Sequence, residues 1–233
     1  MTINNNKYLI ILKYIYKLNI MLTEHADCIL LIFNCKKYKH KALKQKETWL
    51  NHFTLMPYFH VIGEPDLDTE YMFDLNDRTL YVKVNDDYNS LPKKVIAAYN
   101  AINNAYIFKY IFKTDDDQQL SSIRFLETIK SILLNRLPKI HYGGFIIHIN
   151  EPYLSEYYKI HPELPKNLPI MQTQYCGGRF YILSDLAVQQ LIHKRIDIEK
   201  EYLEDYAIGL HLHPTLKHNM LNIQTHLYFT DLT

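Results

Sequence analysis

The sequence is short of glycine, cysteine and tryptophan, with six, three and one of them among 233 residues. The three cysteines, Cys28, Cys35 and Cys176, are odd in number and form no CxxC pair. This pattern argues against a disulfide scaffold and against a structural zinc site. We interpret each cysteine as a small buried residue in a reducing compartment.

The sequence also lacks a strong charge of either sign. Lys and Arg number 26 and Asp and Glu number 25, which leaves a net charge of +1. A balance this even gives no global reason to expect nucleic acid as a partner.

A long apolar run is missing as well. Residues 8–22 are apolar, but Lys13 and Lys17 interrupt them, so the stretch is too short and too charged to span a membrane. No small-residue cleavage site follows it. We expect residues 1–24 to form an amphipathic segment packed on the domain, with an interfacial membrane role left open. We therefore expect no transmembrane segment and cytoplasmic action, in the host cytoplasm if the chain is viral.

Apolar stretches in the remaining sequence alternate between strand and helix patterns. We expect strands at 27–33, 59–62, 79–84, 106–113, 142–149, 175–184 and 221–229, and helices at 39–53, 90–105, 122–134, 185–193 and 204–212. Residues 151–169 read as a long irregular loop, which in a compact domain is often functional. The alternation predicts a single Rossmann-like α/β domain over 1–233 with a mainly parallel central sheet. Ligands of such sheets bind outside the carboxyl ends of the strands.

The strand expected at 106–113 ends almost directly in three carboxylates, Asp115, Asp116 and Asp117. Adjacent aspartates repel one another and bury badly. One interpretation is a Mg²⁺ or Mn²⁺ site shared with substrate phosphates, because such cations prefer hard oxygen ligands. The other is a solvated acidic turn at the start of the next helix, and the triplet alone does not decide between them.

Two further features could belong to a site. Gly177 and Gly178 precede an aromatic run, where missing side chains would let the backbone approach a ligand, although an ordinary turn is the alternative. Glu204 and Asp205 open an expected helix, where acids are also favoured by the helix dipole alone.

Five patches in order resemble one family, the β-1,3-galactosyltransferase and Fringe-like glycosyltransferases, which are inverting enzymes with the GT-A fold. The patches are Lys46–Trp49, Asp87–Lys94, Phe112–Asp117, Tyr175–Ser184 and Glu204–Gly209. The sequence departs from the family where Lys46 replaces Arg and where Gln118 and Gln119 follow the acidic triplet. The family's luminal members also carry a membrane anchor and disulfides that this sequence does not show.

The resemblance implies a metal-dependent inverting transfer of a sugar from a nucleotide sugar, expected to be UDP-linked, to a hydroxyl of a glycan or protein acceptor. It implies Mn²⁺ or Mg²⁺ as cofactor and a β-linkage in the product. By the family's pattern Asp205 is the catalytic base, and Asp117 holds the metal directly. Asp115 holds the ribose, or the metal through water. His226 is the expected third metal ligand, with His213 and His218 as alternatives.

The resemblance also implies residues for each substrate. The donor side is expected to include Asn34, Asp87, Lys94, Asp115 and Asp116. The acceptor side is expected to include Tyr175, Gly177, Gly178 and Glu204. Two other functions stay open: a Mg²⁺-dependent nucleotidyl or phosphoryl transferase built on the same triplet, and a catalytically inert GT-A domain that binds glycan or nucleotide.

Overall fold

The computed structural model describes residues 24–232 of the chain, and the expected amphipathic segment therefore lies almost wholly outside the described residues. The first half forms β1 (Glu24–Phe33), η1 (Lys36–Tyr38), α2 (Lys39–Glu47), β2 (Tyr58–Gly63), β3 (Tyr71–Asp74), β4 (Thr79–Val82), α3 (Leu91–Ala105), β5 (Tyr106–Asp115) and β6 (Gln118–Leu120). The second half forms α4 (Ile123–Asn135), β7 (Tyr142–Ile149), β8 (Tyr153–Ser155), η2 (Tyr157–Lys159), β9 (Leu168–Ile170), β10 (Thr173–Ser184), α5 (Asp185–His193), α6 (Arg195–Ile198), α7 (Glu204–His211), α8 (Pro214–Lys217), β11 (Leu221–Asn222), η3 (Thr225–Leu227) and β12 (Phe229–Asp231).

A central sheet runs through the molecule in the order β11-β7-β10-β5-β1-β2-β4-β3. Its middle strands, β5, β1, β2 and β4, are parallel neighbours, while β10 joins β5 and β3 joins β4 in antiparallel fashion. The predicted α/β class with a mainly parallel central sheet is confirmed. The prediction that 1–233 is one domain stays a prediction.

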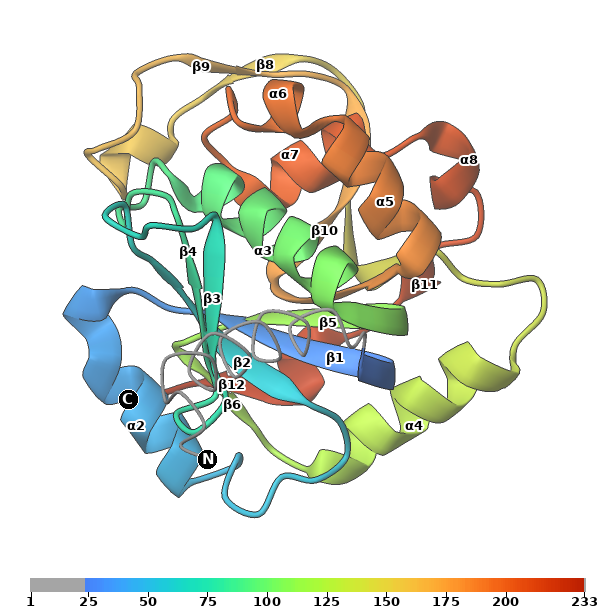
Figure 1. Cartoon of the computed structure of the whole chain (residues 1–233). Coiled ribbons are helices and arrows are strands. Elements are labelled where there is room, and N and C mark those ends of the chain that lie inside the picture. The colour runs from blue at the N-terminus through green and yellow to red at the C-terminus, as the bar shows by residue number, and fades with distance from the viewer. Residues whose placement is uncertain (1–23, 233) are drawn as a thin grey trace, which may run out of the picture.

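Both faces of the sheet are covered, as Figure 1 shows, with α3, α5 and α7 on one side and α4 on the other. The middle strands alternate between two apolar clusters, so that Leu31 and Ile111 join the cluster under α3 while Leu30 and Phe112 join the cluster over α4. Burying each such side chain contributes roughly 1.5–3 kcal/mol. This two-sided burial explains why β1 reads as a continuous apolar run.

Of the two serines expected to cap helices, Ser184 caps α5 but Ser90 does not cap α3. The hydroxyl of Ser184 accepts from the Ala187 N–H at 3.2 Å, as predicted for an N-cap. The side chain of Ser90 does not cap α3; instead the carboxylate of Asp87 accepts the Ser90 N–H at 2.8 Å. Within residues 24–232, no helix combines the length and apolarity that crossing a membrane requires.

Two predicted elements are wrong in extent. The helix expected at 39–53 stops at Glu47, and the chain then turns so that Trp49 faces the tip of β5–β6. The strand expected at 221–229 is broken into β11, η3 and β12. A tight turn, in which the Thr225 N–H donates to the Ile223 carbonyl at 2.9 Å, takes the chain out of the main sheet.

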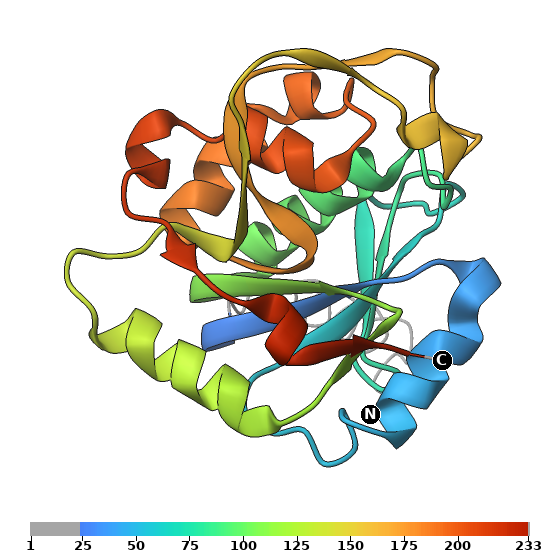
Figure 2. The same ribbon diagram turned by 180° about the vertical axis from the view of Figure 1, so that it is seen from behind.

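The last strand therefore returns across the sheet instead of extending it. β12 pairs antiparallel with β6, the short strand that follows the acidic triplet. Figure 2 shows β12 crossing in front of the sheet, in that view, toward α2. This return brings the C-terminal segment to the same edge as the carboxyl ends of β1 and β5.

The expected loop at 151–169 also has more structure than predicted. Its ends pair as the ribbon β8–β9, and the ring of His161 stacks on Tyr88 at 4.3 Å between centroids. The loop is thereby held near the start of α3.

Candidate functional site

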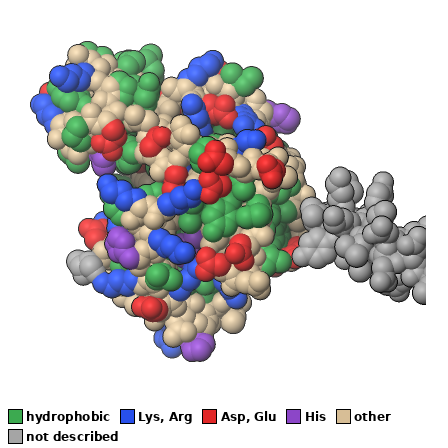
Figure 3. Space-filling view, turned by 60° about the vertical axis from the view of Figure 1, so that its left-hand side comes forward, with side chains coloured by type: hydrophobic (Ala, Val, Ile, Leu, Met, Phe, Trp, Pro, Cys, Tyr) green, Lys and Arg blue, Asp and Glu red, His purple; other side chains and the backbone are tan. Residues whose placement is uncertain are grey.

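The acidic triplet lies where β5 ends, at the carboxyl edge of the parallel strands. In register, Asp115 pairs with Phe33, the last residue of β1. Asp116 and Asp117 then form a turn into β6 rather than continuing an extended strand. Two residues that are two apart on an extended strand project to the same side, but the strand ends between Asp115 and Asp117, so this pattern does not hold for them. On the face of the molecule in Figure 3, acidic and basic side chains lie beside one another around an apolar centre.

Lys113 is the residue that joins the triplet to the rest of the site. Two positions before Asp115 on β5, it points to the same side of the sheet and is 1% exposed. Its Nζ lies 2.7 Å from the Asp115 carboxylate and 3.1 Å from that of Glu204, and it donates to the Gly178 carbonyl at 2.8 Å. Burial opposes its charge, but Asp115 and Glu204 outweigh burial and raise the pKa of Lys113.

Asp205 is held at the start of α7 by two backbone donors. Its Oδ2 accepts the Gly178 N–H at 2.9 Å, and its Oδ1 accepts the Tyr206 N–H at 2.8 Å. Burial raises the pKa of Asp205, and Lys113 and these two N–H groups oppose the rise. A carboxylate with a raised pKa binds a proton more readily than an ordinary aspartate, which suits a general base.

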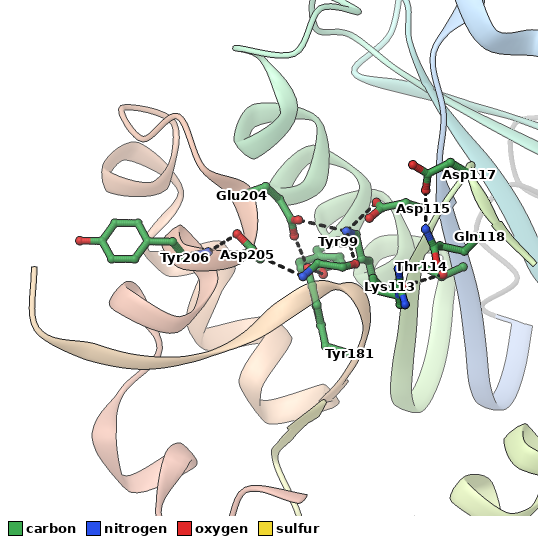
Figure 4. Close-up of polar contacts among 12 residues, drawn as sticks. Tyr99, Lys113, Thr114, Asp115, Asp117, Gln118, Tyr181, Glu204, Asp205 and Tyr206 are labelled. Atoms are coloured by element: carbon green, nitrogen blue, oxygen red, sulfur yellow. Dashed lines mark hydrogen bonds and ion pairs between the residues drawn. The ribbon is translucent and has the colours of Figure 1, made fainter. Parts of the chain in front are cut away.

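Glu204 lies behind Asp205, with both oxygens bound by protein. It is 5% exposed, its Oε1 accepts the Tyr181 hydroxyl, and its Oε2 faces Lys113. Tyr181 in turn lies 2.7 Å from the Tyr99 hydroxyl. Figure 4 shows this chain of contacts between α3, β10 and α7. The structure thus places Glu204 in the layer that supports Asp205, and its predicted acceptor role stays a prediction.

The three aspartates of the triplet have different surroundings. Burial raises the pKa of Asp115 to about 6, with Lys113 opposing it, and raises that of Asp116 to about 6, with Lys41 opposing it. Asp116 faces Lys41 at 3.5 Å. Asp117 accepts from the side-chain amide of its neighbour Gln118 at 2.8 Å.

The predicted donor residues Asn34 and Lys94 meet at the end of β1. Lys94 is 2% exposed and donates to the Asn34 carbonyl at 2.9 Å and to Asp86 at 2.5 Å. Asp86, which sequence reasoning missed, also accepts the N–H groups of Gly63 and Lys36. The Nδ2 of Asn34 is buried without a partner among the described residues, so this amide is available to a ligand.

Three of the residues predicted for the acceptor side, Tyr175, Gly177 and Gly178, lie on β10. Tyr175 is half-buried with its ring edge-on to Tyr206 at 6.0 Å. A side chain at Gly178 would meet Asp205, Lys113 and Asp115, whereas one at Gly177 would meet only the tip of Ile147 and a backbone carbonyl. The two glycines therefore face different surroundings despite being adjacent.

The predicted histidine ligands lie apart from the triplet. His226 is exposed in η3 with its ring edge-on to Phe145 at 6.2 Å, and His213 accepts the Thr215 N–H at the start of α8. Among residues 24–232, no three His, Cys, Asp or Glu side chains gather into a group that could hold a metal ion. The structure thus does not bring His226 together with Asp115 and Asp117.

Sequence reasoning missed Lys113 and Tyr181 as site residues. The signal for Lys113 was present, because a lysine inside an apolar strand needs a buried partner, and Asp115 follows it at the spacing that shares a face. No local pattern could have supplied Glu204 as the second partner, since it comes from α7.

Comparison with known families finds a match over most of the chain. The family model described as Galactosyltransferase matches residues 43–217. A search of curated proteins finds no match. Among solved structures, an active-site mutant of LgtC is similar at a TM-score of 0.41 and 9% sequence identity, covering 83% of this chain and 71% of that one.

Proposed function

We propose a function that starts from the family of the protein. The chain belongs to the galactosyltransferase family, and it is therefore a glycosyltransferase with the GT-A fold. The proposal is that it transfers a sugar from a UDP-sugar to an acceptor hydroxyl of a glycan or protein. The transfer depends on a divalent metal and inverts the configuration at the anomeric carbon.

The observation that carries the proposal is the position of Gly178. A Cβ at this residue would lie 3.5 Å from the Asp205 carboxylate, 3.5 Å from the Lys113 ammonium and 3.6 Å from the Asp115 carboxylate. The triplet expected on the donor side and the expected base therefore converge on one point of backbone that has no side chain. Direct displacement requires the leaving group and the base on either side of one anomeric carbon, and the closeness of the expected donor and acceptor groups at Gly178 supports a reaction of this kind.

Each of these residues has a role in the proposed reaction. Asp205 accepts the proton of the acceptor hydroxyl as the new bond to the anomeric carbon forms, since the hydroxyl is otherwise too weak an acid. The Gly178 N–H fixes the orientation of the Asp205 carboxylate. Lys113 holds Asp115 and Glu204 in place, and removing it would leave the buried carboxylate of Glu204 uncompensated, at a cost of about 3–5 kcal/mol.

The residues at the end of β5 fit a divalent cation. Asp115 and Asp117 offer hard oxygen ligands, and the buried Oε1 of Gln118 beside them has no partner among the described residues. Such a cation, when bound, supplies positive charge that stabilises the departing nucleoside diphosphate. Asn34 and Lys94 lie at the neighbouring strand end, where a nucleotide would extend.

The test is Asp205→Asn in the full chain. We expect kcat for UDP release in the presence of Mn²⁺ to fall by about 10²–10⁴-fold, the usual effect of losing a general base, because the amide cannot accept the proton. UDP affinity, measured by calorimetry, should change little, because Asp205 faces the acceptor side.

The matched control is Asp197→Asn, which removes a carboxylate whose contacts are surface ion pairs with Lys194 and Lys200. Near-normal kcat in Asp205→Asn would remove this residue from the mechanism. A parent protein that binds UDP but releases none from UDP-sugars would favour the inert domain, and release of pyrophosphate from a nucleotide would favour the nucleotidyl transferase.

A further inference from the structure

The ribbon β8–β9, with η2 between its strands, is fastened to the domain at two places. At one place the side-chain amide of Asn89, just before α3, donates to the Glu163 carbonyl at 2.9 Å. At the other, the Met171 N–H donates to the hydroxyl of Tyr206, the residue that follows Asp205, at 2.7 Å. Figure 1 and Figure 2 both show η2 beside the chain that enters α3. The segment therefore reaches from the start of α3 to the start of α7, where Asp205 lies.

Three aromatic rings form a row where η2 meets the chain before α3. The rings of Tyr88 and His161 stack with their centroids 4.3 Å apart and their planes 10° apart. The ring of Tyr157 is also nearly parallel to that of His161, at 5.8 Å and 9°. Tyr157 is 48% exposed, so much of this last ring is open to a ligand.

Tyr88 and Tyr175 lie near the proposed base from two sides. Burial raises the pKa of Tyr88, and Tyr157 and Asp205 raise it further. Burial likewise raises the pKa of Tyr175, and Asp205, Tyr153 and Tyr157 add to the rise. Because charges influence one another less as they move apart, Asp205 lies close to the hydroxyls of both. The ring of Tyr175 is also edge-on to that of Tyr206 at 6.0 Å.

The hydroxyls of these tyrosines are not used inside the protein. The buried hydroxyls of Tyr99 and Tyr142 are each hydrogen-bonded, at 2.7 and 2.8 Å. Among residues 24–232, by contrast, no hydrogen bond engages the hydroxyl of Tyr88, Tyr157 or Tyr175, although Tyr88 and Tyr175 are half-buried. Half-buried hydroxyls beside an open ring can bind a polar ligand.

A neutral sugar ring fits these surroundings. One face of a pyranose carries C–H groups, which pack on aromatic rings, and its edge carries hydroxyls, which donate and accept hydrogen bonds as tyrosine hydroxyls do. Asp205 disfavours an anionic group. A serine or threonine side chain offers one hydroxyl and at most a methyl group, and it would leave the ring of Tyr157 and the free hydroxyls without a partner.

We propose that Tyr88, Tyr157 and Tyr175 form the acceptor subsite beside Asp205, and that this subsite holds the terminal sugar of a glycan and not a protein side chain. The inference rests on the proposed function and narrows its acceptor. The C–H face of the sugar packs on the ring of Tyr157, and sugar hydroxyls bind the tyrosine hydroxyls. One sugar hydroxyl is thereby directed to Asp205.

The test is sugar binding by the full chain with UDP and Mg²⁺ present. The probes are the methyl β-glycosides of galactose, glucose and N-acetylglucosamine, and saturation-transfer NMR measures their affinity without turnover. We expect at least one of them to bind the parent protein. Tyr157→Ala should weaken that binding by at least about fivefold, because the stacked ring is lost.

Conservative variants separate the ring from the hydroxyl. Tyr157→Phe should restore most of the affinity lost in Tyr157→Ala, since the ring remains. Tyr175→Phe keeps its ring contact with Tyr206 and should weaken sugar binding severalfold through loss of the hydroxyl. UDP affinity, measured by calorimetry, should match the parent in both variants at position 157.

The matched control is Tyr158→Ala. Tyr158 is the next residue of η2, and its ring contacts no other aromatic ring among residues 24–232. Sugar binding by this variant should therefore match the parent. Thermal stability of Tyr157→Ala should also stay near the parent value, because the side chain is exposed.

The outcomes are distinct. Glycosides that bind the parent and Tyr157→Ala equally would overturn the subsite and leave the proposed function standing. A parent protein that binds UDP and transfers sugar to a serine- and threonine-containing peptide, but binds no glycoside, would also overturn it in favour of a protein acceptor. A parent protein that neither binds UDP nor releases it from UDP-sugars would overturn the proposed function itself.

Discussion

At the scale of single residues, the site depends on one position without a side chain. Gly178 donates its N–H to Asp205 and accepts from Lys113 through its carbonyl, so one residue of β10 links Asp205, the proposed base, to the strand that ends in the triplet. The atoms around its missing Cβ are charged and belong to the candidate site, and they lie at ordinary contact distance. A glycine at position 178 therefore leaves space free between these charged groups, and it is not required to relieve backbone strain.

Gly178→Ala should fold but lose activity. A Cβ there would be in van der Waals contact at 3.5–3.6 Å with Asp205, Lys113 and Asp115, so the free energy of unfolding should change by less than about 1 kcal/mol. The methyl group would occupy the space in which we propose that the substrates meet, and we expect kcat/KM to fall by at least about tenfold, equivalent to 1.4 kcal/mol.

Gly177→Ala is the matched control for this variant. The family resemblance assigns Gly177 to the acceptor side, but the structure directs a side chain at this position toward Ile147 and away from Asp205. Its Cβ would lie 3.4 Å from the flexible tip of Ile147 and away from the charged residues, so both stability and kcat/KM should stay near the parent values. Equal activity in the two alanine variants would contradict the placement of the reacting groups beside Gly178.

At the scale of elements, the position of α7 is set by close contact with β10. A Cβ at Gly209 would lie 2.1 Å from the Cβ of Tyr175 and 2.8 Å from the Gln174 carbonyl, so the helix rests directly on the strand backbone. The same helix begins with Glu204 and Asp205. Packing at Gly209 therefore sets the position of Asp205, the proposed base.

Gly209→Ala should destabilise the protein and impair catalysis together. The added methyl cannot fit without moving α7, and overpacking of this kind costs about 1–3 kcal/mol or more. Urea unfolding of Gly209→Ala should show a lower midpoint with an unchanged slope. The midpoint of Gly177→Ala, which lies on β10, the strand that α7 contacts, should stay near the parent value. Unchanged stability would mean that α7 shifts freely, contrary to the contact described.

Elements with a strong local pattern could be predicted from the sequence. The apolar run of β5, the amphipathic pattern of α4 and the Ser184 cap of α5 each follow from neighbouring residues. The split of 221–229 could not be predicted in this way, because β12 leaves an apolar-looking stretch to pair with β6, more than a hundred residues earlier. The ion pair of Lys113 with Glu204 is equally non-local. The aspartates of the candidate site could therefore be predicted from the sequence, but Lys113 and Tyr181, which contact them or their neighbours, could not.

At the scale of the whole molecule, the buried histidine of β2 makes stability depend on pH. His60 is 1% exposed, and neither ring nitrogen has a hydrogen-bond partner among the described residues. Burial lowers its pKa to about 3, with a smaller contribution from Lys46, while Asp77 opposes the shift. The folded protein thus holds His60 in its neutral form.

His60→Phe should reduce acid sensitivity. The unfolded chain protonates this histidine near pH 6.5 and the folded chain only near pH 3, so its contribution to stability is present above about pH 6.5 and is lost as the pH falls toward 3. The slope is at most about 1.4 kcal/mol per pH unit for one proton. Urea unfolding of parent and variant between pH 7 and pH 4.5 should show a gap that changes in favour of the variant at the acid end. A constant gap would mean that His60 is not neutral in the fold.

The pairing of β12 with β6 has a consequence for the order in which the protein is made. The edge that carries the candidate site is built from Asn34 at the end of β1, Asp117 beside β6, and β12, which pairs with β6. A ribosome delivers these segments in that order, and a domain generally folds as a unit. β12 also supplies Phe229 to the apolar cluster over α4, so the acidic edge and that side of the core both stay incomplete until translation has passed residue 231. A ribosome stalled before this point would display a chain that has neither.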